Sequence, residues 1–235
     1  MKTVDRKTAV ITGGTKGIGR AIVLLFEKNG FRVITCSRHE KDLANLEEQV
    51  GEDAIETYQA DLANRDEVDG FVDFVKKTSN RVDVLVNNAG VFLPGAVYEE
   101  SEENLEFMMN TNLYSAYHLT RGLVGEMISN KAGDIFNVCS VASQMAYPNG
   151  GSYSISKFAL YGMSKALREE LKPHGIRVTS VLPGATLTAS WQGIDLPNDR
   201  FIKPEDVAEA IWGAYSLSRN SVVEDLVIRP QLGDI

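Results

Sequence analysis

The chain has few of the residues on which disulfide frameworks and metal centres depend. Its 235 residues include only two cysteines and three histidines. Cys36 and Cys139 each lie in an apolar run typical of a buried strand, which argues against a disulfide between them. No cysteine or histidine lies in a cluster with metal-ligand spacing, so we expect no metal site. The default compartment for such a chain is the cytoplasm.

Long apolar runs and an excess of positive charge are also missing. Apolar stretches such as residues 21–26 are far too short to cross a bilayer. Residues 1–6 lack the apolar core of a secretory leader. With 24 Lys and Arg against 32 Asp and Glu, the formal net charge is −8. We therefore expect neither a nucleic acid nor a membrane surface as a partner.

The pattern that is present is that of one α/β domain. Hydrophobic residues make up 43% and charged residues 24%, and the length suits a single domain with a sizeable core. Apolar strand-like runs alternate with helical patterns, which predicts a doubly wound parallel sheet with helices on both faces. Strands are predicted at 8–12, 31–36, 54–59, 82–86, 133–139, 176–182 and 223–229. Helices are predicted at 17–29, 40–50, 64–78, 102–129, 151–172 and 204–218.

A glycine-rich turn follows the first predicted strand. Residues 8–12 are apolar and β-branched, Gly13-Gly-Thr-Lys-Gly17-Ile-Gly19 comes next, and a helical pattern follows. Such a turn gathers backbone N–H groups and the positive end of a helix at one place, which suits a pyrophosphate. A glycine loop between a strand and a helix can also be only a turn.

Tyr153 and Lys157 are four residues apart in a predicted helix, so their side chains share one face. A free tyrosine titrates near about 10, which is too high for efficient proton exchange at neutral pH. A nearby ammonium favours the phenolate, and lowering the pKa by two or three units needs roughly 3–4 kcal/mol. We therefore predict that Lys157 lowers the pKa of Tyr153. Without further context, the same spacing also fits an exposed pair on a helix surface.

Six short segments place these residues in a wider pattern. They are Thr12-Gly-Gly-Thr-Lys-Gly-Ile-Gly19, Asp61-Leu62, Asn87-Asn-Ala-Gly90, Asn112 within Thr111-Asn-Leu113, Ser140 thirteen residues before Tyr153, and Pro183-Gly184 followed by Thr188. In this order, and over nearly the whole chain, they resemble the motifs of the classical short-chain dehydrogenase/reductase family. The resemblance implies a single Rossmann-type domain with strand order 3-2-1-4-5-6-7, a cofactor half at about 1–90 and a catalytic half at about 91–235. It also implies binding at the carboxyl ends of the strands.

The resemblance implies four catalytic residues. Tyr153 is expected to protonate a developing alkoxide while a nicotinamide gives hydride to the carbonyl carbon. Ser140 is expected to hold the substrate oxygen, and Lys157 to bind the nicotinamide ribose. Asn112 is expected to position a water that links Lys157 to solvent. Two alternatives stay open, because Ser140 can simply cap a strand turn and Asn112 can be a helix residue that faces solvent.

The same resemblance implies a set of cofactor contacts. They are Gly13, Thr15, Lys16, Gly17, Ile18, Gly19, Ser37, Arg38, Asp61, Leu62, Asn88, Ala89, Gly90, Tyr153, Lys157, Pro183, Gly184, Thr186 and Thr188. Asp61 should accept a hydrogen bond from the adenine amino group, although an aspartate before a helix is also a good N-cap. Asn87 is expected to brace the central strands.

The end of the second predicted strand bears on which nicotinamide dinucleotide is used. NAD-selective sites usually carry Asp or Glu about 20 residues after the glycine loop. This chain has Ser37-Arg38 there, and no carboxylate occurs before Glu40. Arg38 offers a planar fork for a 2′-phosphate and Lys16 a second positive charge, so we predict that NADP(H) is preferred over NAD(H). Both cations can instead be solvated surface charges.

By resemblance, the chain is expected to be an NADPH-dependent oxidoreductase that reduces a ketone or aldehyde reversibly to an alcohol. An apolar pocket is predicted from Phe92, Met145, Tyr147, Trp191 and Leu196, and it suits small carbonyl compounds or a 3-oxoacyl thioester. The alternative is a dinucleotide-binding sensor without turnover. The long predicted helices carry broad apolar faces, and the resemblance implies that they form the interface of a homodimer or homotetramer, although such a stripe can simply pack on the sheet.

Overall fold

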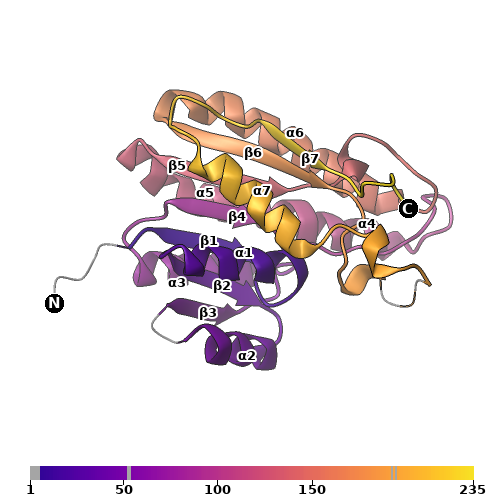
Figure 1. Ribbon diagram of the computed structural model, residues 1–235, viewed down its shortest axis with the longest axis horizontal. Coiled ribbons are helices and arrows are strands. Elements are labelled where there is room, and N and C mark those ends of the chain that lie inside the picture. Colours follow the sequence, from indigo (N-terminus) through magenta and orange to yellow (C-terminus); the bar gives the residue numbers. More distant parts are fainter. Residues whose placement is uncertain (1–5, 52–53, 192, 194) are drawn as a thin grey trace.

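The centre of the computed structural model is a seven-stranded parallel sheet (Figure 1). The structure describes residues 6–51, 54–191, 193 and 195–235, so residues 1–5 of the segment considered for a secretory leader lie outside it. The strands are β1 (Thr8–Thr12), β2 (Arg32–Ser37), β3 (Ile55–Gln59), β4 (Val84–Asn87), β5 (Gly133–Val138), β6 (Ile176–Pro183) and β7 (Asp225–Ile228). Their order, β3-β2-β1-β4-β5-β6-β7, confirms the prediction.

The strands form because their apolar side chains are covered from both sides. Every residue of β1, β4, β5 and β6 is buried, as is usual for the inner strands of a parallel sheet. The edge strands β3 and β7 are partly exposed. All neighbouring strands pair in parallel, from Ser37 opposite Gln59 in the β2–β3 pair at one side to Pro183 opposite Ile228 in the β6–β7 pair at the other. Their carboxyl ends therefore meet at one edge of the sheet.

Helices cover both faces of this sheet. One core is formed with α1 (Gly17–Lys28), α2 (Glu40–Val50) and α7 (Pro204–Ser216), and the other with α3 (Arg65–Thr78), α5 (Ser115–Asn130) and α6 (Gly151–Leu171). In Figure 1, α1 and α7 lie in front of the sheet. Phe26 of α1 packs edge-on against Trp212 of α7, with ring centroids 5.2 Å apart. The fold is thus a single Rossmann-like domain, as predicted.

One predicted helix differs from the structure. The segment 102–129 consists of α4 (Glu102–Met109), a π-helical turn (Asn110–Tyr114) and α5. A π turn adds a residue to the helical repeat without breaking the helix, so the apolar pattern of the sequence does not reveal it. Such turns often occur at functional sites, and this one contains Asn112.

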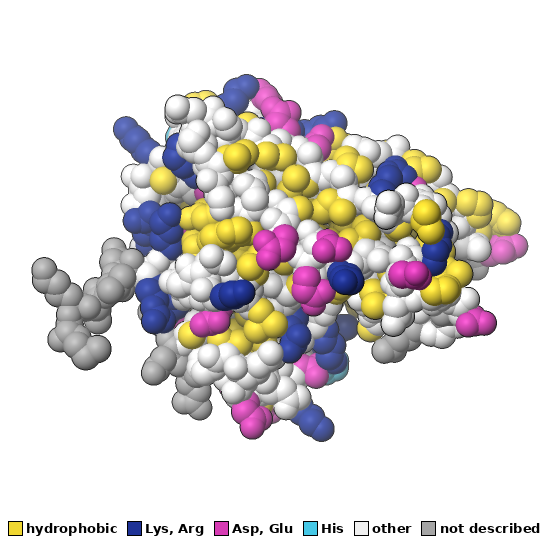
Figure 2. Space-filling model, viewed as in Figure 1, with side chains coloured by type: hydrophobic (Ala, Val, Ile, Leu, Met, Phe, Trp, Pro, Cys, Tyr) yellow, Lys and Arg dark blue, Asp and Glu magenta, His cyan; other side chains and the backbone are white. Residues whose placement is uncertain are grey.

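The remaining features concern the surface and the cysteines. Within the described ranges, no helix is long and apolar enough to span a bilayer, and no group of three acidic, histidine or cysteine side chains could hold a metal. Figure 2 shows side chains of both charge signs interspersed on the face it presents. Cys36 and Cys139 are free and buried, and burial raises the pKa of both thiols to about 12.

Candidate active site

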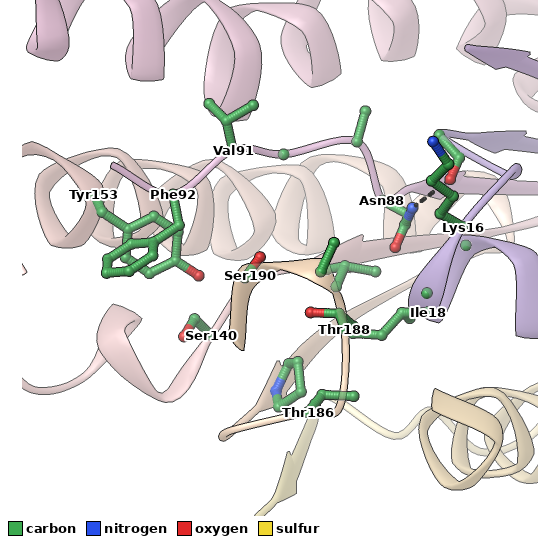
Figure 3. A pocket seen from close by; sticks show the side chains of 18 of the residues that line it. Lys16, Ile18, Asn88, Val91, Phe92, Ser140, Tyr153, Thr186, Thr188 and Ser190 are labelled. Atoms are coloured by element: carbon green, nitrogen blue, oxygen red, sulfur yellow. Dashed lines mark hydrogen bonds between the residues drawn. The ribbon is translucent and has the colours of Figure 1, made fainter. Parts of the chain in front are cut away.

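A cleft of about 880 Å³ opens at the carboxyl ends of the strands. It spans the point between β1 and β4 where the strand order reverses, which is where open α/β sheets bind ligands. Tyr153 and Phe92 lie at one end of it, and Lys16, Ile18 and Asn88 at the other (Figure 3). Every predicted cofactor and catalytic residue lines this cleft apart from Asn112, which is buried behind it.

The glycine turn is shaped by direct backbone contact. Gly13 and Gly17 have φ angles of +66° and +53°, which favour glycine. A Cβ on Gly19 would lie 2.2 Å from the carbonyl oxygen of Gly13, so no other residue fits there without displacement. The first turn of α1 contains no acidic residue, which leaves its positive end facing the cleft uncompensated. The arrangement suits an anionic group.

The loop after β4 is fastened to the glycine turn. The Thr12 hydroxyl accepts hydrogen bonds from the backbone N–H groups of Asn88 and Ala89, both at 2.9 Å. The Asn88 side chain donates to the carbonyl oxygen of Thr12 at 2.8 Å. Asn87 instead donates to the side chains of Asn137 (2.8 Å) and Thr120, within the protein interior. This contact is the bracing of the central strands that the sequence predicts.

The end of the cleft near Lys16 and Arg38 contains an ion pair that the sequence did not indicate. The Lys16 ammonium lies 2.6 Å from the Asp42 carboxylate, in the first turn of α2. The Lys16 side chain is 65% exposed and that of Asp42 22%. Lys16 is therefore not a free positive charge, because a carboxylate that also lines the cleft holds it. Arg38 is exposed at the same end.

Asp61 is not the N-cap of the helix that follows it. Its Oδ1 accepts a hydrogen bond from the backbone N–H of Ala63 at 3.0 Å, which closes a local turn. The N-cap of α3 is Asn64, whose side-chain oxygen accepts from the backbone N–H of Asp66 at 3.0 Å. The capping alternative for Asp61 is thus wrong, and its carboxyl group lines the cleft.

Ser140 makes the capping contact that was left open for it, and its expected contact with a substrate oxygen stays a prediction. It lies two residues after β5, which ends at Val138, and it caps a short 3-10 turn, Val141–Ser143, by accepting a hydrogen bond from the N–H of Ala142 at 3.1 Å. The residue also lines the cleft, and Figure 3 shows its hydroxyl below the Tyr153 ring. A cap fixes the hydroxyl in place and leaves one lone pair and its proton for a ligand.

Tyr153 and Lys157 face the cleft from α6, but the pKa of Tyr153 is not shifted in the predicted direction. The Lys157 Nζ lies 5.8 Å from the Tyr153 ring centroid and donates to the carbonyl oxygen of Val138 at 2.9 Å. Desolvation raises the pKa of Tyr153 to about 12, although the Ser140 hydroxyl acts to lower it. Burial lowers the pKa of Lys157 to about 8. The pKa of Tyr153 is thus raised and not lowered as predicted, because desolvation by burial is its largest cause.

Asn112 is only 1% exposed, so the solvent-facing alternative is wrong. Its Oδ1 accepts from the backbone N–H of Val91 at 2.7 Å, and its Nδ2 donates to the Val91 carbonyl oxygen and the Ser156 hydroxyl. Asn112 therefore ties the loop after β4 to α6. A water between Asn112 and Lys157 stays a prediction.

The far side of the cleft from the glycine turn is largely apolar. Phe92, Met145, Tyr147 and Trp191 line it as predicted, whereas Leu196 does not. Asp234 and Ile235 also line the cleft, and no motif in the sequence indicated them. They lie there because the segment after β7 passes beside Gly184, which follows β6 and donates its N–H to the Ile228 carbonyl oxygen at 2.8 Å. A Cβ on Gly184 would lie 3.4 Å from Oδ1 of Asp234.

Comparisons with known proteins agree with this geometry. The sequence model described as short chain dehydrogenase matches residues 7–198. The chain is 34% identical to a sepiapterin reductase of Chlorobaculum tepidum, with 96% of this chain and 97% of that protein covered. Among solved structures, an actinorhodin polyketide ketoreductase with NADPH is 27% identical, with both chains fully covered and a TM-score of 0.89. A metagenomic short-chain oxidoreductase in complex with NADP is 29% identical, covering 96% of this chain and 97% of that one, with a TM-score of 0.84.

Proposed function

The chain belongs to the short chain dehydrogenase family of oxidoreductases, and we propose that it reduces a ketone or aldehyde carbonyl to an alcohol with NADPH. The observation that carries this proposal is the meeting of three groups at one end of the cleft. The hydroxyls of Tyr153 and Ser140 and the ammonium of Lys157 line that end, while the glycine turn lines the other. A proton donor and an anion site thus lie at opposite ends of one cleft, as binding of a dinucleotide cofactor beside a substrate requires.

The cleft has the chemistry that a nicotinamide dinucleotide requires. The glycine turn brings the first turn of α1, which starts at Gly17, to the cleft, and the N–H groups of a helix's first turn suit the pyrophosphate. A Cβ on Gly17 would lie 3.0 Å from the Thr188 side chain, so the glycine turn and the loop after β6 meet across the cleft. Pro183, Gly184 and Thr186 of that loop are proposed to hold the nicotinamide end, and Asp61 and Leu62 the adenine end.

NADP(H) is proposed to bind more tightly than NAD(H). Arg38 and Lys16 line the adenine end, and similar structures are described with NADP or NADPH. The planar guanidinium of Arg38 can make two parallel hydrogen bonds to a 2′-phosphate. Lys16 can add its charge only by leaving or sharing the carboxylate of Asp42.

The protein groups provide positioning and the proton. When bound, the reduced cofactor supplies the hydride. With a pKa of about 12, the Tyr153 hydroxyl is protonated at neutral pH, which is the form that a reduction consumes. Ser140 donates a hydrogen bond to the same substrate oxygen that receives the Tyr153 proton. Lys157, with a pKa of about 8, can give up and regain a proton near neutral pH and thus resupply the tyrosine.

The apolar end of the cleft favours a small carbonyl compound with a neutral, preferably aromatic, body. Phe92 packs edge-on against Tyr153 with ring centroids 4.9 Å apart, and Met145 and Tyr147 keep 45% and 39% of their surface exposed beside it. Sepiapterin and polyketide ketones are candidate substrates, because two similar proteins are named a sepiapterin reductase and a polyketide ketoreductase. A 3-oxoacyl thioester is a further candidate.

The proposal is tested by following NADPH oxidation at about 340 nm with a panel of carbonyl compounds. The panel contains an aliphatic ketone, an aromatic ketone, an aldehyde, sepiapterin and a 3-oxoacyl thioester, with NADH in parallel reactions. We expect turnover with at least one neutral ketone or aldehyde. NADPH binding without turnover of any member would contradict the proposal and favour the dinucleotide-binding sensor.

A homodimer in the cytoplasm is proposed as the working form. Apolar side chains on α5 and α6 are exposed, among them Tyr117 at 40%, Ile155 at 42% and Phe158 at 45%. A second copy packed on these helices would cover them. Light scattering distinguishes this dimer from a monomer or a tetramer. The two free cysteines are compatible with a reducing compartment.

A further inference from the structure

The helix that carries Tyr153 and Lys157 has no cap of its own. α6 begins at Gly151, and its N-cap residue, Gly150, has no side chain that could accept a hydrogen bond. The first turn of α6 also lacks an acidic residue. The first N–H groups of a helix have no partner within it, so an acceptor from elsewhere is needed to hold this turn.

That acceptor is Glu100, which lies 52 residues before Ser152 in the chain. Its Oε1 accepts a hydrogen bond from the backbone N–H of Ser152 at 3.2 Å, and its Oε2 lies 3.4 Å from the same nitrogen. Oε1 also accepts from the Ser152 hydroxyl, which is buried. The carboxylate thereby holds both polar groups of the residue that precedes Tyr153, at the positive end of the helix.

Two glycines allow this contact to be close. Gly95 donates its N–H to the Asn149 carbonyl oxygen at 3.0 Å. A Cβ on Gly151 would lie 2.9 Å from Oε2 of Glu100 and 2.3 Å from the Gly95 carbonyl oxygen. A Cβ on Gly95 would lie 2.8 Å from the Cβ of Glu100. The segment 91–100 therefore packs against the start of α6 with no room for other side chains.

The same segment contacts Tyr153 directly at its other end. The ring of Phe92 lies edge-on to the Tyr153 ring, and the backbone of Val91 is held by Asn112. The first turn of α6 is thus held by two contacts. The Phe92 ring packs against the Tyr153 ring, and the Glu100 carboxylate accepts hydrogen bonds from Ser152. Glu100 itself does not line the cleft.

We infer that Glu100 is a positioning residue for Tyr153, and that its carboxylate fixes the first turn of α6 so that the phenol reaches the substrate oxygen beside Ser140. This inference rests on the proposed carbonyl reduction. A cap that served stability alone would change the unfolding transition and leave turnover at saturating substrate unchanged. A positioning residue changes kcat because a misplacement of about 1 Å can lower the rate on the order of 100-fold.

The test compares Glu100→Ala, Glu100→Gln and Glu100→Asp by steady-state kinetics, with NADPH affinity measured separately by fluorescence. Glu100→Ala is expected to lower kcat by about tenfold to 100-fold with little change in NADPH affinity. Glu100→Gln is expected to restore most of kcat, because its amide oxygen can accept the same hydrogen bonds. Glu100→Asp retains the charge but is one methylene shorter, so kcat is expected to fall although the protein folds.

Two further variants separate positioning from stability. Ser152→Ala removes one of the two groups that Glu100 holds, and its effect on kcat should be strongly non-additive with that of Glu100→Ala. Glu47→Ala is the matched control, because Glu47 also accepts a hydroxyl hydrogen bond, from Thr57 at 2.5 Å, on the opposite face of the sheet from α6. It is expected to lower stability and leave kcat unchanged.

The kcat values of these variants decide whether Glu100 positions Tyr153. An unchanged kcat in Glu100→Ala would overturn it, as would additive effects of Glu100→Ala and Ser152→Ala. A loss of kcat in Glu47→Ala as large as that in Glu100→Ala, at equal loss of stability, would overturn it too. If Glu100→Ala does not fold, Glu100→Asp and Glu100→Gln decide, and equal kcat in these two would overturn it. Failure of the proposed function is recognised separately, because the unaltered protein would then turn over no carbonyl compound.

Discussion

The burial of the Lys157 ammonium predicts how the free energy of unfolding depends on pH, and this prediction can be tested without knowing the substrate. Lys157 is only 4% exposed, and burial lowers its pKa from the ordinary value of 10.5 to about 8. Its Nζ donates to a carbonyl oxygen, that of Val138, rather than to a carboxylate. Lys157→Met keeps a side chain of similar length and removes the charge.

The sign of the effect follows from the two pKa values. Between pH 8 and pH 10.5 the unfolded chain holds a proton that the folded protein has lost, so the free energy of unfolding rises with pH in this window. Below pH 8 the folded protein holds Lys157 in its charged form, and burying that charge lowers the free energy of unfolding by about 3 kcal/mol, at about 1.4 kcal/mol per pKa unit. Lys157→Met should therefore stabilise the protein at pH 7 by up to about 3 kcal/mol, less about 1 kcal/mol for the lost hydrogen bond.

The assay is urea unfolding of the two proteins at pH 7, 8, 9 and 10, followed by far-UV circular dichroism. The raised pKa values of Tyr153 and Cys36 lower stability above about pH 9 in both proteins alike. Because Lys157 acts to lower the raised pKa of Cys139, both proteins are compared in a Cys139→Ala background, where the difference reports Lys157. Lys165→Met, an exposed site on the same helix, is the control and should show no such pH dependence. A difference between Lys157→Met and the parent that is constant from pH 7 to pH 10 would refute the reasoning.

Two predictions concern the cofactor end of the cleft. Asp42→Asn releases Lys16 from its carboxylate, so the ratio of kcat/KM for NADPH to that for NADH should rise several-fold, on the order expected for one charge in a partly hydrated cleft. Arg38→Asp should lower the same ratio, and equal use of both cofactors by the parent would contradict the proposed preference. Gly19→Ala places a Cβ 2.2 Å from the Gly13 carbonyl oxygen, so NADPH affinity should fall by at least about tenfold in a fluorescence titration, and unchanged affinity would show that the turn can relax.

The strands and the glycine turn could be predicted because local sequence determines them. An inner parallel strand such as β1 is buried on both faces and therefore consists of apolar and β-branched residues. A backbone turn such as that at Gly13 needs a residue that tolerates positive φ, and the glycine that meets this need is visible in the sequence. Motif order then places Ser140 and Tyr153 at the same edge of the sheet.

The features that the sequence did not reveal depend on tertiary contact. The Lys16–Asp42 ion pair and the Glu100–Ser152 contact join residues whose separation carries no periodic signal. The π turn around Asn112 keeps the helical pattern of its neighbours. The pKa of Tyr153 was predicted in the wrong direction, because spacing indicates which charge is near and desolvation depends on everything packed around it.

The most direct test of the account is the turnover of Tyr153→Phe, which removes one hydroxyl group and leaves the ring against Phe92. With a carbonyl substrate identified from the panel, kcat should fall by at least about 100-fold while NADPH binds with unchanged affinity. A variant that keeps more than a few per cent of the parent's turnover would show that another group delivers the proton.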